Sequence, residues 1–187
     1  MNTGLISSRY AYSLLEFSIE NREQKEVYNK MKLLSDLYIH TPLLKRTIHD
    51  RSLRRSEKKK LLVTACGNNI PDSLDKMFDL ILKNEREEII QFIALQFVKL
   101  YRERFKIQHG KITTAYPMKS EELDYFVSRI QKIINESIEI DEEVDPKIIG
   151  GFILQLGDYR WDASLSGEFS RIKKQIRGVE ENIKIDR

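Results

Sequence analysis

The segment from Asp145 to Ser164 constrains the fold more than any other part of the chain. The chain has eight glycines in 187 residues, and four of them fall within eighteen residues, at positions 150, 151, 157 and 167. In order, the segment holds a Gly-Gly pair, an apolar run, a Gly-Asp step and a second strand-like run. Glycine at the first central position of a two-residue loop favours a type II′ turn. The segment therefore predicts a β-hairpin.

The Gly-Gly pair could cradle a phosphate or mark a close backbone approach. Gly150-Gly151 lacks the G-x-x-x-x-G-K-[ST] pattern of a phosphate-binding loop, and a strand rather than a helix is expected after it. Glycine at the start of a strand is typical of a place where a neighbouring element comes very close. We therefore favour a structural role for both glycines.

Residues 1–106 carry helical patterns throughout and predict a six-helix bundle. Thr41-Pro42 and Pro71-Asp72 are typical helix starts, Ser56 is the expected cap of the fourth helix, and residues 84–86 interrupt the pattern. The apolar stripes are formed by Ile6, Tyr10, Leu14 and Phe17; Val27, Met31, Leu34 and Tyr38; Leu74, Phe78, Ile81 and Leu82; and Ile89, Ile93, Phe97 and Tyr101.

Residues 110–187 predict a small α+β domain, so the whole chain is expected to be mainly α. Residues 112–116 and 138–140 alternate like strands, and Ser120 is the expected cap of a helix between them. A heptad stripe then follows the hairpin on a C-terminal helix, and it could pack on its own sheet or on a partner's coiled coil. The stripe consists of Leu165, Phe169, Ile172, Ile176, Val179 and Ile183.

Composition and charge narrow the classes of function. No run approaches the roughly 18 apolar residues of a membrane span, no signal peptide is expected, and one cysteine excludes an internal disulfide. Residues 1–106 hold 20 Lys and Arg against 14 Asp and Glu, whereas residues 107–187 hold 12 against 15. This asymmetry indicates two units with different partners.

Catalytic and metal-binding chemistry finds little support in the residues. His40, His49 and His109 are far apart and form no ligand motif, and Cys66 has no histidine at motif spacing, so a structural cysteine is expected. We expect no metal, no cofactor and no catalytic residue. The basic cluster at residues 45–60 could bind nucleic acid, but it lacks aromatic residues and could equally be a solvated helix face.

Three segments of the chain together resemble one known family. They are Arg9-Tyr10-Ala11 within the first helix, Leu82-Lys83-Asn84-Glu85-Arg86, and the Gly-Gly segment through Asp162-Ala163-Ser164. In order and spacing they are similar to the delta subunit of bacterial F-type ATP synthases, the counterpart of the mitochondrial oligomycin-sensitivity-conferring protein. Alanine at 163, where the family often has glycine, and Glu168, where it has basic residues, depart from the family pattern.

The resemblance implies a stator subunit that performs no chemistry and couples proton translocation to ATP synthesis. It would lie peripherally on the cytoplasmic face of the bacterial inner membrane. The family's N-terminal domain, here residues 1–106, binds the N-terminal helix of the alpha subunit in a groove between its first and fifth helices. The implied groove residues are Arg9, Tyr10, Ser13, Leu14, Phe17, Phe78, Asp79 and Leu82.

The second domain, residues 110–187, would bind the C-terminal helices of the b subunits. The implied contact residues are Gly150, Gly151, Asp162 and Ser164, and the tail from 178 to 187 runs past the family's usual end. A helical nucleic-acid-binding protein that uses residues 45–60 stays the alternative.

Overall fold

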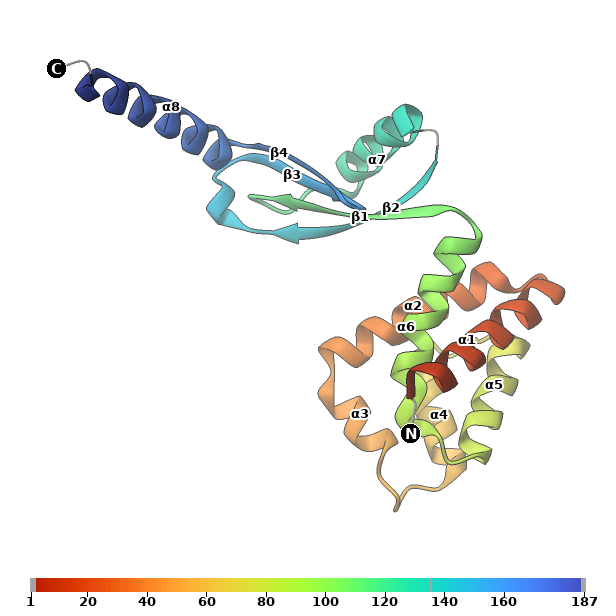
Figure 1. Cartoon of the computed structure of the whole chain (residues 1–187). Coiled ribbons are helices and arrows are strands. Elements are labelled where there is room, and N and C mark those ends of the chain that lie inside the picture. Colours follow the sequence, from red (N-terminus) through yellow and green to blue (C-terminus); the bar gives the residue numbers. More distant parts are fainter. Residues whose placement is uncertain (1–2, 135, 186–187) are drawn as a thin grey trace. The chain divides into compact units, whose positions relative to one another are not determined.

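The computed structural model describes residues 3–134 and 136–185, and side chains in the last helix as far as Ile176 with the exception of Gln175. The chain divides into two units, residues 1–105 and residues 106–187. The first unit is helical, and the second contains a four-stranded sheet with two helices (Figure 1). The prediction of a mainly helical chain with a small C-terminal α+β region is confirmed.

The first unit contains short connections between its helices. Its elements are α1 (Thr3–Glu20), α2 (Gln24–His40), α3 (Pro42–Ile48), α4 (Arg55–Ala65), α5 (Asp72–Lys83), the 3-10 helix η1 (Glu87–Ile89) and α6 (Ile90–Arg104). Helix α1 packs mainly on α6, and small side chains allow this, because Ser7 and Ala11 on its inner face are fully buried. The smallness of Ala11 thus serves the core of the unit.

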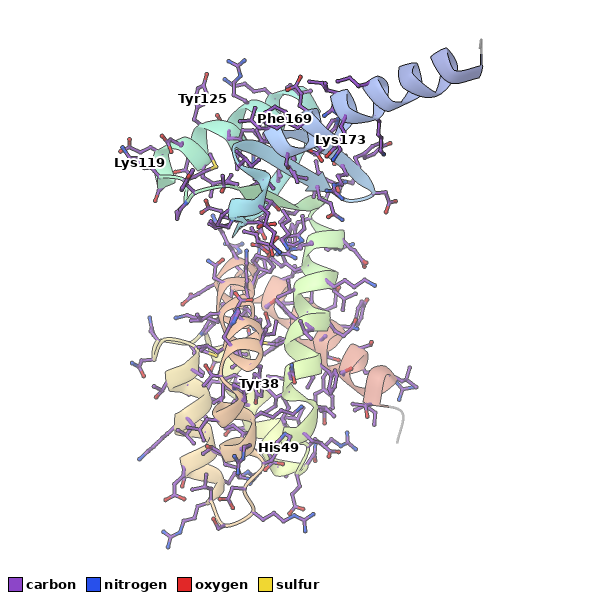
Figure 2. The ribbon with its side chains drawn as sticks, turned by 90° about the vertical axis from the view of Figure 1, so that its left-hand side faces the viewer. Tyr38, His49, Lys119, Tyr125, Phe169 and Lys173 are labelled. Carbon is purple, nitrogen blue, oxygen red and sulfur yellow. The ribbon has the colours of Figure 1, made fainter. Side chains whose placement is uncertain are left out.

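Apolar stripes from several helices meet in the core of the first unit. Met31, Leu34, Phe78 and Phe97 are among its largest fully buried side chains. Tyr38 of α2, labelled in Figure 2, is also buried, and burial raises the pKa of its hydroxyl. The helical spacing seen in the sequence therefore reports a packed interior, which holds α1 and α5 beside each other.

The second unit is built on a sheet in the order β2-β1-β3-β4. Its strands are β1 (Ile107–Thr114), β2 (Ser137–Val144), β3 (Gly151–Leu156) and β4 (Tyr159–Ser164), with α7 (Ser120–Ile134) and the 3-10 helix η2 (Pro146–Ile148) between them and α8 (Leu165–Ile185) after them. Strands β1 and β2 are parallel, as expected for strands joined through a helix, and the other pairs are antiparallel.

Strands β3 and β4 form the predicted hairpin. Leu156 pairs with Tyr159 across a two-residue loop, where Gly157 has a φ of +56° and Asp158 does not share the positive φ. That combination fits a type II′ turn. On the face that carries α7, Phe126 meets Phe152 edge to face at 5.0 Å, whereas Tyr125 points outward (Figure 2). The sheet thus has one covered face and one charged face, where His109 and Lys111 pair with carboxylates of β2.

Three local expectations were wrong. Ser56 lies inside α4, because the cap is Arg54, two residues earlier, whose backbone N–H donates to Glu57 at 2.8 Å. Ser120 likewise lies inside α7, where Glu122 accepts the N–H of Lys119 at 3.0 Å. The first strand begins at Ile107, before the expected residue 112, because its pairing with parallel β2 starts there.

Among the described residues, no helix combines the length and apolar character required to cross a membrane.

Candidate functional site

A hollow of about 420 Å³ lies between α1 and α5. Apolar side chains form most of its wall, and the side chains of Arg9 and Lys76 add positive charge. From α1 it is lined by Arg9, Tyr10, Ser13, Leu14 and Phe17, and from α5 by Ser73, Lys76, Met77 and Leu80. We call this surface the α1–α5 groove.

Five of the eight residues expected in this groove do line it, all of them from α1. The three from the α5 region do not. Phe78 and Leu82 are 1% and 3% exposed and belong to the core. Asp79 faces α4, where its carboxylate pairs with Lys59 at 2.9 Å and borders a neighbouring hollow. The apolar stripe of α5 points into the unit, so the groove wall comes from the residues beside the stripe.

Leu80 is the groove residue that sequence reasoning missed most clearly. It is 48% exposed, and it lies off the buried stripe of α5. An apolar residue on the polar face of an amphipathic helix is the signal that could have identified it. Lys76, its neighbour in the groove wall, also stands over the ring of Phe17 at 5.5 Å, which ties α5 to α1.

The turn after α5 holds Tyr10 in place at the groove. Asn84 and Arg86 each donate a hydrogen bond to the Tyr10 hydroxyl, both at 3.1 Å, and the Arg86 guanidinium lies 5.8 Å from the Tyr10 ring centre. The first two of the three segments that carry the family resemblance are therefore in contact, although they are more than 70 residues apart in sequence.

In the second unit, the four expected contact residues form the joint between the hairpin and α8. Ser164 accepts the N–H of Gly167 at 3.0 Å and so caps α8. Asp162 accepts from both the N–H and the hydroxyl of Ser164, at 3.0 and 2.6 Å, and these bonds lower the pKa of Asp162. The carbonyl of Gly150 accepts from Leu165 N–H at 3.0 Å. This joint sets the direction in which α8 leaves the sheet.

Close packing explains why glycine occupies position 151. Its φ is +72°, and a Cβ placed there would lie 2.2 Å from the backbone oxygen of Ala163. Gly150 is less restricted, since its Cβ would meet only the side chain of Leu165, at 3.0 Å. The expected close approach of backbone is confirmed at Gly151, whereas the neighbour of Gly150 is a side chain.

Helix α8 carries an apolar stripe that no other described element covers. Phe169, labelled in Figure 2, is 60% exposed, and the other described members of the stripe are 46% to 56% exposed: Leu165, Ile172 and Ile176. The side chains of Val179 and Ile183 lie outside the described residues, as do residues 186 and 187. Of the tail, only the helical backbone of residues 178–185 is described. The described side chains of the stripe are not covered by the sheet of this unit, and packing on a partner's coiled coil stays a prediction.

The basic cluster at residues 45–60 is partly neutralised within the protein. Lys58 pairs with Glu87 at 2.8 Å, and Lys59 pairs with Asp75 and Asp79, both at 2.9 Å. Lys58 is 7% exposed. A mixed-charge hollow of about 670 Å³ is lined by five basic residues, His49, Arg51, Arg55, Lys58 and Lys83, and by three glutamates, Glu85, Glu87 and Glu88. Carboxylates therefore interrupt the positive charge of the cluster, which does not form a continuous basic surface.

The three histidines are isolated from one another on the surface, and the cysteine lies in the core, as expected. His40, His49 and His109 are exposed on different elements, and His49 is labelled in Figure 2. Cys66 is fully buried, and burial raises the pKa of its thiol to about 12, so it stays protonated near neutral pH. Within the described part of the chain, no three His, Cys, Asp or Glu side chains gather as metal ligands.

Comparisons with known proteins agree with one another. The family described as "ATP synthase delta (OSCP) subunit" matches residues 6–176. The ATP synthase subunit delta of Phocaeicola vulgatus is 34% identical over 181 residues, covering 94% of this chain and 96% of that protein. The subunit of the same name from Bacteroides thetaiotaomicron is 33% identical over 178 residues, with the same coverage.

A solved structure shares the fold at much lower identity. A chain of the Toxoplasma gondii mitochondrial ATP synthase hexamer superposes with a TM-score of 0.61 and 13% identity, over 91% of this chain and 96% of that one. None of these comparisons supports the nucleic-acid alternative. Because the family match spans most of the sequence and full-length relatives exceed 30% identity, the chain belongs to the ATP synthase delta (OSCP) subunit family.

Proposed function

We propose that this protein is a non-catalytic stator subunit of a rotary ATP synthase, which holds the catalytic head against the torque of the rotor. One observation carries the proposal: each unit has its own uncovered apolar surface, the α1–α5 groove in the first and the α8 stripe in the second. A protein that links two partners needs two such surfaces. Family membership supplies the complex in which the link operates.

In this proposal helices α1–α6 act as one six-helix bundle, residues 1–106, whose α1–α5 groove takes the N-terminal helix of the alpha subunit. An amphipathic helix would bury the exposed parts of Leu80 and Phe17 against its own apolar face, as in other helix-in-groove complexes. A nanomolar complex corresponds to about −12 kcal/mol. An interface of about 800 Å² per partner with an apolar centre can reach that value.

The second unit, residues 110–187, would bind the C-terminal helices of the b subunits through the α8 stripe. A four-three spacing of apolar residues is the seam of a coiled coil, and a solvent-exposed seam is stable only when a second helix covers it. Gly150, Gly151, Asp162 and Ser164 contribute by holding α8 in position. The protein would then be peripheral, attached at the cytoplasmic face of the inner membrane through its partners.

The groove is tested by calorimetric titration of the full chain with a peptide that covers the alpha-subunit N-terminal helix. Leu80→Asp and Tyr10→Asp place a carboxylate in the groove and should weaken binding at least about tenfold, since each introduces an unpaired charge into an apolar contact. The matched control is Leu33→Asp on α2, where the leucine is 42% exposed. Equal affinities for Leu80→Asp and Leu33→Asp would contradict the groove assignment.

The α8 stripe is tested in the same way with a C-terminal fragment of the b subunit. Phe169→Asp should abolish binding, whereas Ser170→Asp, a substitution of the next residue on the other side of the helix, should preserve it. Loss of binding in both variants would indicate a general effect on α8 and would overturn the stripe as the contact surface.

A further inference from the structure

We infer that Tyr10 is a directional hydrogen-bond donor at the α1–α5 groove, aimed by Asn84 and Arg86, and that the helix bound there presents a carboxylate to it. This inference rests on the proposed function of the groove, and it goes further by naming the chemistry that the occupant must carry. Asn84 and Arg86 act as positioning residues, because they reach the occupant only through Tyr10.

The inference starts from the inventory of donors and acceptors around one oxygen atom. A guanidinium can only donate, and an amide nitrogen can only donate, so Arg86 and Asn84 fill the two acceptor sites of the Tyr10 oxygen at 3.1 Å each. The phenol proton is then left over. Among residues 3–134 and 136–185, the structure shows no acceptor that receives it.

The backbone at the end of α5 fixes both positioning residues. Arg86 N–H donates to Ile81 O at 3.1 Å, and Glu85 N–H donates to Leu82 O, with Glu85 at a φ of +51°. These two bonds around one left-handed residue are a Schellman motif. It explains the interruption at residues 84–86, and it projects the side chains on either side of Glu85 towards α1.

A donor fixed in this way selects its partner. If the occupying helix left the Tyr10 proton unpaired inside the interface, the complex would bear the cost of an unsatisfied buried polar group. Arg9 and Lys76 line the same groove, whose described lining includes no acidic residue, so the local charge favours an acidic acceptor over a neutral one. The geometry points to an Asp or Glu of the bound helix opposite Tyr10.

The test uses the full chain and the alpha-subunit N-terminal peptide, with the urea midpoint of every variant measured beside its affinity. Tyr10→Phe keeps the ring and removes the proton, and we expect about 5- to 30-fold weaker binding. Tyr12→Phe is the matched control, because Tyr12 is 57% exposed two residues away on the same helix, and its affinity should equal that of the wild type.

A double-mutant cycle separates positioning from a general structural effect. Arg86→Met should weaken binding in the wild-type background and change nothing further in the Tyr10→Phe background, because its only route to the peptide has been removed. Additive losses would overturn the positioning role of Arg86. Replacing the acidic residues of the peptide one at a time should reveal one whose loss matters to the wild type and not to Tyr10→Phe.

The outcomes distinguish this inference from the proposed function. If the wild-type chain does not bind the peptide at all, the proposed occupant of the groove is wrong, and the inference falls with it. If the wild type binds and Tyr10→Phe binds equally well, the groove assignment stands and the donor role of Tyr10 is refuted. Sensitivity to no acidic residue of the peptide would refute the carboxylate.

Discussion

Gly151→Ala is the substitution that most sharply tests the physical account of the Gly-Gly segment. Two features of position 151 oppose a side chain: a φ of +72°, and the backbone oxygen of Ala163 only 2.2 Å from where the Cβ would lie. The obstructing atoms belong to backbone on a paired strand, so they can retreat only if β3 and β4 separate.

The magnitude follows from these two terms. A left-handed conformation costs a residue with a Cβ about 1–2 kcal/mol. Crowding in a packed region adds about 1–3 kcal/mol. The sum of about 2–5 kcal/mol is a large part of the stability of a small domain, which is about 5–15 kcal/mol in total. We therefore expect the second unit of Gly151→Ala to unfold at much lower urea concentration.

Trp161 makes the assay specific to the second unit, because it is the sole tryptophan and lies on β4 opposite Leu154. Two other glycines serve as controls. Gly157→Ala shares the positive φ but meets nothing closer than Gln108 Oε1 at 4.0 Å, so it should lose only about 1–2 kcal/mol. Gly150→Ala meets a movable side chain, and should cost less than Gly151→Ala.

The order of the three urea midpoints shows whether the close approach of Ala163 is what requires glycine at position 151. Gly151→Ala must be the least stable of the three by fluorescence of Trp161. A midpoint for Gly151→Ala equal to that of Gly157→Ala would show that the close approach of Ala163 is not the constraint, and the structural explanation of the Gly-Gly pair would be refuted.

The remaining predictions concern local features. Ser164→Ala removes the cap that Gly167 N–H uses and should cost about 0.5–2 kcal/mol, read as lost helicity and a lower Trp161 midpoint. Glu85→Gly relieves a left-handed residue and should stabilise the first unit by about 1 kcal/mol in urea unfolding monitored by circular dichroism. Burial opposes ionisation of Glu87, but hydrogen bonds from Lys58 and backbone prevail and lower its pKa. Its stabilisation is therefore present above the ordinary glutamate pKa and lost as pH falls through the lowered value, so Glu87→Gln should flatten the acid side of the stability profile.

Helix positions could be predicted from the sequence because they depend on local spacing. The stripes through Met31 and Phe78 identify α2 and α5, and both side chains are buried as the stripes imply. Helix caps were less predictable. Serine is the commoner cap, but at both Arg54 and Lys119 a glutamate three residues later accepts the free N–H instead.

The groove was only half predictable. Periodicity identifies which residues of a helix face inward, and it assigned Phe78 and Leu82 correctly to an apolar stripe. The family resemblance placed the same two residues in the groove, but they do not line it. The wall includes Leu80, which stands off that stripe. The contact of Tyr10 with Asn84 and Arg86 joins segments far apart in sequence, and no local pattern encodes which distant side chains will meet.

The family resemblance and the structure indicate different roles for the four residues expected to bind a partner in the second unit. The family pattern suggested that Gly150, Gly151, Asp162 and Ser164 contact a partner directly. Their hydrogen bonds and close contacts lie within the joint that aims α8. Their influence on the partner is proposed to be indirect, through the exposed stripe of that helix.

The central claim is that the protein links two partners through two separate surfaces, and affinity purification from detergent-solubilised membranes tests it most directly. The wild-type chain should recover both the alpha and the b subunits. Leu80→Asp should lose alpha and keep b, and Phe169→Asp should lose b and keep alpha. If the wild type recovers neither subunit, or if each variant loses both at once while remaining folded, the two-surface account is contradicted.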